Sequence, residues 1–132
     1  MLEKLEIKAG LDTPKIDFDP ISGNLVIEGK SFPPNVAEFY KTVLDWIDAY
    51  LKQPAAQTTL HLKLEYFNTA SSKMIMDMLY KLEEFYRHGG NIKIIWYYPT
   101  DDEDMQETGI EYSELLDLPF EFVSYKFVIE EE

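Results

Sequence analysis

The chain has 132 residues, of which 45% are hydrophobic, so it can form one domain spanning residues 1–132 with a core that needs no disulfide. Its net charge of −13 argues against binding to nucleic acid or to anionic membranes, and the absence of cysteine excludes a thiolate metal site and a cysteine nucleophile. Residues 1–10 do not predict a signal peptide and no segment is apolar enough to span a membrane, so we expect a cytoplasmic protein.

The N-terminal part of the chain predicts a β-hairpin. Apolar and polar residues alternate over residues 15–19, residues 20–24 are of types that favour turns, and residues 25–28 again have strand character. Residues 5–7 predict an additional edge strand. The sheet therefore begins with antiparallel strands.

The first helix is predicted to start after Asn35. The side chain of Asn35 can cap the helix, and Glu38 stands three positions on, where it can complete a capping box. Apolar residues then recur at helical spacing from Val36 to Leu51, and Pro54 marks the end. We expect one apolar face about four turns long.

A strand and a second long helix follow. Leu60, Leu62, Leu64 and Tyr66 alternate with polar residues, which predicts a strand with one buried face. The helix after it carries an apolar face between Met74 and Tyr86 and ends at residues 89–90, which are both glycine.

The C-terminal third predicts a further strand, a helix and a last strand. Residues 92–98 are apolar on both faces, which favours a central strand, and an acidic helix is expected over residues 102–116 before a strand at residues 120–127. The predicted fold class is α/β, with the order β-β-α-β-α-β-α-β and a mixed sheet whose helical crossovers join parallel strands.

The segment that joins the third predicted strand to the second helix is the strongest functional candidate. Asn68, Thr69, Ser71 and Ser72 are all capping-type residues, and one cap explains only one of them. No carboxylate occurs between Glu65 and Asp77, although helix N-termini usually favour them. Free backbone N–H groups there, with Lys73 nearby, suit an anion that is either bound or covalently attached. From the residues alone, a simple cap and a phosphorylation switch remain equally open.

Other candidate sites carry less weight. His61 and His88 are expected to be solvated, and the acidic run at residues 101–104 is expected to be the exposed first turn of a helix. Met76 is expected to be an exposed, adaptable contact. We predict no metal, no cofactor and no catalytic residues, because the chain has no phosphate-binding glycine loop and no nucleophile motif.

The segment 66–77, YFNTASSKMIMD, resembles the central motif of the SiaC-type regulatory phosphoproteins, relatives of the STAS-domain anti-sigma-factor antagonists. Pro34 and Ala70 depart from the family pattern. Weaker matches accompany the motif at residues 13–16, 29–33, Asn35, Trp46, 101–105 and 119–120.

The resemblance implies a STAS-like fold with Thr69 as phosphoacceptor, and it leaves Ser71 and Ser72 as alternatives. It further implies a kinase of histidine-kinase-like ATPase fold, a PP2C-type phosphatase, and an effector, such as a diguanylate cyclase, that binds when Thr69 is unphosphorylated. The expected contact surface comprises Asn68, Thr69, Ser71, Ser72, Lys73 and Met76.

Two competing hypotheses belong to other functional classes. In the first, the helix N-terminus cradles a free phosphate or a nucleotide. In the second, the acidic residues around Asp101 serve a metal-dependent enzyme, which nothing in the sequence requires.

Overall fold

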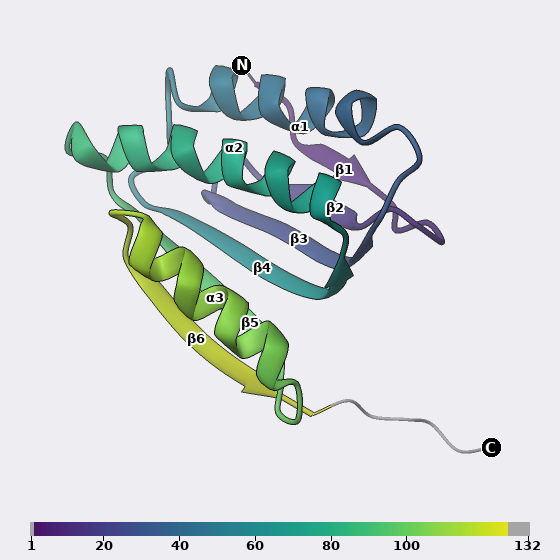
Figure 1. Ribbon diagram of the computed structural model, residues 1–132. Helices are drawn as coiled ribbons and strands as arrows, with labels where there is room; N and C mark the ends of the chain where they lie inside the picture. Colours follow the sequence, from purple (N-terminus) through teal and green to yellow (C-terminus); the bar gives the residue numbers. More distant parts are fainter. Residues whose placement is uncertain (1, 127–132) are drawn as a thin grey trace.

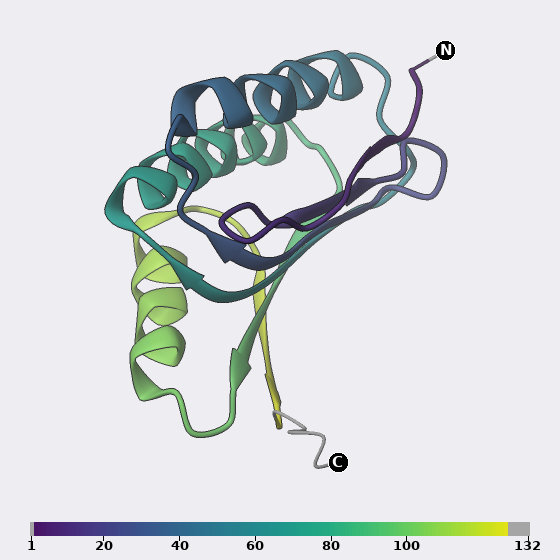
Figure 2. The same ribbon diagram turned by 90° about the vertical axis from the view of Figure 1, so that its right-hand side faces the viewer.

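The structure, a computed structural model, describes residues 2–126, which form six strands and three helices (Figures 1 and 2). Along the chain, the elements are β1 (Leu5–Ile7), β2 (Lys15–Phe18), β3 (Asn24–Ser31), α1 (Val36–Tyr50), β4 (Thr58–Phe67), α2 (Thr69–Arg87), β5 (Ile92–Pro99), α3 (Glu103–Leu115) and β6 (Phe120–Tyr125). The predicted order of elements is confirmed, including the extra edge strand β1. Residue 127, the predicted end of β6, lies outside the described residues.

All six strands belong to one mixed sheet, in the order β1-β2-β3-β4-β5-β6. The first two pairings are antiparallel and the following three are parallel, which confirms the predicted hairpin and crossovers. In a parallel sheet joined by helices, the carboxyl ends of the strands lie at one edge, and each following helix begins there. The N-terminus of α2 is therefore placed beside the ends of β3 and β4.

The helices cover one face of the sheet and leave the other open (Figure 2). Along β4 from Thr58 to Leu64, residues on the helix side are buried, whereas those on the open side are half-buried. The core lies between this covered face and the apolar sides of α1 and α2, with Tyr40, Ile47 and Leu79 among its fully buried members. The alternation seen in the sequence thus marks the covered and open faces correctly.

Strand β5 is not the centre of the sheet, as the sequence had suggested, but lies next to the edge strand β6. Its second apolar face belongs to the open side of the sheet, where the ring of Tyr97 stacks on His61 and the Tyr97 hydroxyl lies 2.9 Å from His61 Nδ1. His61 lies on the open face, as predicted, but the prediction that it is simply solvated was wrong in part, because its side chain is half-buried. Burial, together with the charge of Lys93, lowers the pKa of His61.

The predicted start of α1 is confirmed. Asn35 Oδ1 accepts a hydrogen bond from the backbone N–H of Glu38 at 3.2 Å, and Asn35 Nδ2 donates to Glu38 Oε2 at 2.7 Å. The pair satisfies a free N–H group at the helix start, as a capping box does, although the carboxylate contacts the side-chain amide and not the backbone.

Helix α3 packs over β5 through a glycine. Asp102 caps the helix by accepting a hydrogen bond from the backbone N–H of Met105 at 3.0 Å. Trp96 Nε1 donates to the carbonyl oxygen of Met105 at 3.0 Å, which holds the indole ring beneath the helix. Gly109 lies over that ring, because a side chain there would overlap it. This contact positions α3 against the sheet.

Among residues 2–126, no helix is both long and apolar enough to cross a membrane.

Replacing Gly109 with alanine tests the packing of α3. A Cβ atom at Gly109 would lie 2.5 Å from Cδ1 and Nε1 of Trp96, whose ring is buried and hydrogen-bonded. We expect Gly109→Ala to lower the free energy of unfolding by about 1–2 kcal/mol, even though alanine favours the helix by about 1 kcal/mol. Urea denaturation measures the change. The control Glu107→Ala, at an exposed position of α3, should stay within about 0.5 kcal/mol, and equal losses for the two variants would contradict this packing.

Candidate functional site at the first turn of α2

Asn68 is the residue that caps α2, which decides among the four capping-type side chains of this segment. Its Oδ1 accepts a hydrogen bond from the backbone N–H of Ser71 at 2.9 Å. Its own backbone N–H donates to the carbonyl oxygen of Ser31 at the end of β3, at 3.1 Å. The turn is therefore held both by the cap and by the neighbouring strand.

Ser71 is part of a buried chain of hydroxyl groups. Ser31 Oγ donates to Ser71 Oγ at 2.8 Å, and the hydroxyls of Ser31 and Tyr40 are 2.6 Å apart. All three side chains are fully buried, and burial raises the pKa of Tyr40. The prediction that Ser71 lies on an exposed contact surface was wrong, because the hydroxyl points into the junction of β3, α1 and α2.

Ser72 connects α2 to α3. Its hydroxyl is hydrogen-bonded to that of Tyr112, on α3, and the Ser72 side chain is half-buried. Burial raises the pKa of Tyr112, and the charge of Glu111 raises it further. Ser72 thus has an internal partner, and α3 is attached to the first turn of α2.

Thr69 is exposed and lines a groove of about 560 Å³ between the first turn of α2 and α3. Lys73, also exposed, does not line this groove. Met76 is half-buried against the core, so its predicted role as an exposed contact was wrong in part. Of the predicted contact residues, Thr69 and Lys73 are the two that are exposed.

The groove is acidic, which the local sequence did not indicate. Glu65 comes from β4, Asp102 and Asp104 from the start of α3, and Glu111 from the middle of α3. Among residues 2–126, no Lys or Arg lines the groove. The absence of carboxylates between Glu65 and Asp77 had suggested an anion site, but α3 brings carboxylates to the same place from residues more than thirty positions away in the sequence.

An exposed aromatic pair borders the groove and was also missed. Phe32, just after β3, and Tyr66, near the end of β4, pack edge to face with ring centroids 5.8 Å apart. Phe32 is 39% exposed and Tyr66 is 51% exposed. The alternation along β4 predicted a buried Tyr66, but its side chain is exposed near the carboxyl end of the strand.

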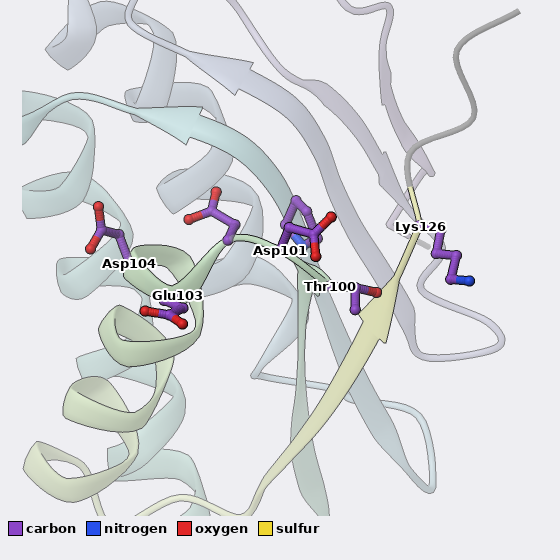
Figure 3. Close-up of a pocket in the computed structure, with 7 residues that line it drawn as sticks. Thr100, Asp101, Glu103, Asp104 and Lys126 are labelled. Carbon is purple, nitrogen blue, oxygen red and sulfur yellow. The ribbon is translucent and has the colours of Figure 1, made fainter.

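A second surface pocket, of about 1000 Å³, surrounds the loop between β5 and α3 (Figure 3). The side chains of Asp101, Glu103 and Asp104 point in different directions in Figure 3 and do not converge on one point. Within residues 2–126, no group of three His, Cys, Asp or Glu side chains is arranged to hold a metal ion. The acidic run therefore forms the exposed start of α3, as the helix dipole favours.

Two alanine variants separate the structural hydroxyl from the exposed one. Ser71→Ala leaves the buried hydroxyls of Ser31 and Tyr40 with one partner fewer, so we expect it to lower the free energy of unfolding by about 1–3 kcal/mol. Thr69→Ala removes an exposed group and should change the free energy of unfolding by at most about 0.5 kcal/mol. Guanidinium denaturation monitored by circular dichroism makes the comparison. A larger loss for Thr69→Ala than for Ser71→Ala would contradict these assignments.

Known proteins match this chain over most of its length. The model of a family described as SiaC family regulatory phosphoproteins matches residues 7–125. An uncharacterized protein of Pseudomonas aeruginosa (strain UCBPP-PA14) is 34% identical over 119 residues, which cover 90% of this chain and 94% of that relative.

Solved structures of SiaC from the same organism share the fold. One is the crystal structure of the diguanylate cyclase SiaD in complex with its activator SiaC, with a TM-score of 0.87 at 33% identity over 92% of this chain and 99% of the matched chain. Another is that of apo-SiaC, with a TM-score of 0.84 at 33% identity over 92% and 98% of the two chains. These matches confirm the predicted resemblance and the α/β fold. The chain belongs to the SiaC family of regulatory phosphoproteins.

Proposed function

We propose that this protein is a phosphorylation-switched regulator that binds an effector through the first turn of α2 when Thr69 is unphosphorylated. Thr69 is the phosphoacceptor in this proposal, and the protein acts by binding, without catalysis of its own. It works in the cytoplasm as one domain spanning residues 1–132. Membership of a family of regulatory phosphoproteins supports the class of function.

The observation that carries the choice of Thr69 is the different surroundings of the three hydroxyls in this turn. Ser71 is fully buried and hydrogen-bonded, so a kinase would have to unfold the turn to reach it. Ser72 is half-buried and bonded to Tyr112. Thr69 is exposed at the mouth of the groove, where a kinase and a phosphatase can both reach it.

A phosphoryl group at Thr69 would change both charge and hydration. It adds about −1.5 to −2 charge at neutral pH and three oxygens that bind water strongly. A partner packed dry against this turn would have to remove that water, at a cost of several kcal/mol unless the phosphate found new partners. In the part of the chain that the structure describes, no Lys or Arg lines the groove to neutralise the phosphate. Phosphorylation therefore opposes the effector complex.

The effector is proposed to be a diguanylate cyclase. The support is the likeness to SiaC, which is described as the activator of the diguanylate cyclase SiaD in their complex. The other partners in the proposal are a kinase of histidine-kinase-like ATPase fold that modifies Thr69 and a PP2C-type phosphatase that restores it. Together these proteins form a partner-switching circuit.

The acidic groove argues against the competing hypothesis of a phosphate or nucleotide site. Backbone N–H groups at a helix start attract anions, but four carboxylates line the same space, and no described Lys or Arg lines it beside them. A free phosphate would be repelled. The binding of a protein partner is the function that this surface supports best.

Variants of Thr69 test the switch directly. Binding to a candidate diguanylate cyclase from the source organism is measured by isothermal titration calorimetry. Thr69→Ala should bind within about twofold of the wild type, because it removes only a methyl and a hydroxyl group. Thr69→Glu should bind about tenfold more weakly or worse, because it places a charge in the interface. Equal affinity for the three proteins would overturn the mechanism.

Thr42→Glu is the matched control, since Thr42 is exposed on α1, away from the groove, and should bind as the wild type does. Phosphopeptide mapping of protein purified from its native cells, with phosphatases inhibited, tests the acceptor itself. Phosphate on Thr69 is expected. Phosphate on Ser72 alone, or none under any growth condition, would contradict the assignment.

A further inference from the structure

We propose that the effector segment recognised at this site is both apolar and basic: its apolar side chains contact a patch formed by Phe32 and Tyr66, and its arginine or lysine enters the acidic groove. This inference rests on the proposed function and specifies the chemistry of the partner. It also shifts the expected contact surface, from the outer side of α2 toward the end of the sheet.

The apolar patch is formed by two exposed aromatic side chains, Phe32 and Tyr66, and the loop that carries Leu11 lies beside it. Leu11, in the loop between β1 and β2, is 95% exposed. The backbone N–H of Phe32 donates to the carbonyl oxygen of Asp12 at 2.8 Å, so this loop is attached beside Phe32. Phe32 in turn packs edge to face against Tyr66. Exposed aromatic and aliphatic side chains grouped in this way mark interaction surfaces.

Tyr66 connects the patch to the groove, because it belongs to both. Thr69 lines the same groove. One partner segment can therefore lie across the apolar patch and the acidic groove, with Thr69 in its path. A phosphoryl group on Thr69 would lie in the path of this segment. Phosphorylation would therefore oppose binding of the same segment, as the proposed switch requires.

The carboxylates of the groove have no cationic partner within the described part of the chain. None of the ion pairs formed among residues 2–126 includes Glu65, Asp102, Asp104 or Glu111. Asp102 is engaged as the cap of α3, but the other three have no such role for their carboxylates. Unpaired carboxylates around an exposed tyrosine ring suit a guanidinium or ammonium group, which can contact the ring face and pair with the acids.

Charge also argues against the other occupants of this surface. A second copy of the chain would bring the same acidic groove and a further net charge of −13. A nucleic acid or an acidic peptide would be repelled for the same reason. A segment with apolar side chains and one or two basic residues is complementary to both halves of the surface, and we commit to that partner.

The first experiment uses defined peptides, so that it does not depend on the cyclase. The ¹⁵N-labelled chain is titrated with acetyl-Leu-Arg-Ile-Arg-Leu-amide and with the matched peptide that carries glutamate in place of arginine. The arginine peptide should shift the amide resonances of Phe32, Thr69 and Thr108, and the glutamate peptide should not. Equal shifts with both peptides, shifts centred elsewhere, or no shifts with either would overturn the inference.

Paired variants then test each half of the surface. Glu111→Lys should abolish the shifts, whereas Glu114→Lys, the same charge change at an exposed position of α3 outside the groove, should keep them. Phe32→Ser should weaken the shifts at Thr69 and Thr108, whereas Ile21→Ser, at a 78% exposed residue in the β2–β3 turn, should not. Equal effects within either pair would overturn the corresponding half.

The cyclase complex separates this inference from the proposed function. Its affinity should fall about tenfold in Glu111→Lys and should also fall as salt is raised from about 50 to about 500 mM, because screening weakens attraction between opposite charges. If Thr69→Glu weakens binding while salt and Glu111→Lys do not, the switch stands and the basic segment is wrong. If Thr69→Glu binds as tightly as the wild type while the peptide results hold, the basic segment stands and the switch is wrong.

Discussion

The arrangement of this site depends on a buried chain of three hydroxyl groups. Ser31, Tyr40 and Ser71 come from the end of β3, from α1 and from the first turn of α2, and each has a hydrogen-bond partner in the core. Buried polar groups are tolerated only when they are paired in this way, so the three elements can meet in one geometry. That geometry leaves Thr69 on the surface while its neighbour two positions on is fully enclosed.

Helix α3 completes the site from the other side. The Trp96 indole and Gly109 set how closely α3 approaches β5, and the bond between Ser72 and Tyr112 attaches α3 to α2. The carboxylates of α3 then line the groove beside Thr69. An acidic, aromatic-edged groove lined by an exposed threonine is suited to binding a protein segment, and among the described residues no Lys or Arg lines the groove to balance a phosphate.

Much of the fold follows from local patterns. Alternation along β4 separates its covered and open sides, Asn35 and Glu38 mark the start of α1, and the order of strands and helices predicts the mixed sheet. The position of β5 in the sheet was predicted wrongly. Its open face carries Tyr97, which stacks on His61, so this face needs no second layer of helices. An apolar residue on a strand shows that something packs against it, and this can be a neighbouring side chain as well as a helix.

The sequence by itself determined the elements, their order, the family resemblance and the segment that carries the site, because these depend on neighbours within a few residues. It did not determine which hydroxyl of that segment is exposed. Ser71 and Thr69 are both hydroxyl residues of the same segment, and only the packing of β3, α1 and α2 buries Ser71. Nor did it indicate the sign of charge in the groove, since Asp104 and Glu111 reach Thr69 only once α3 packs on the sheet. Burial and electrostatics depend on distances in space, and the chain sets these distances only when it has folded.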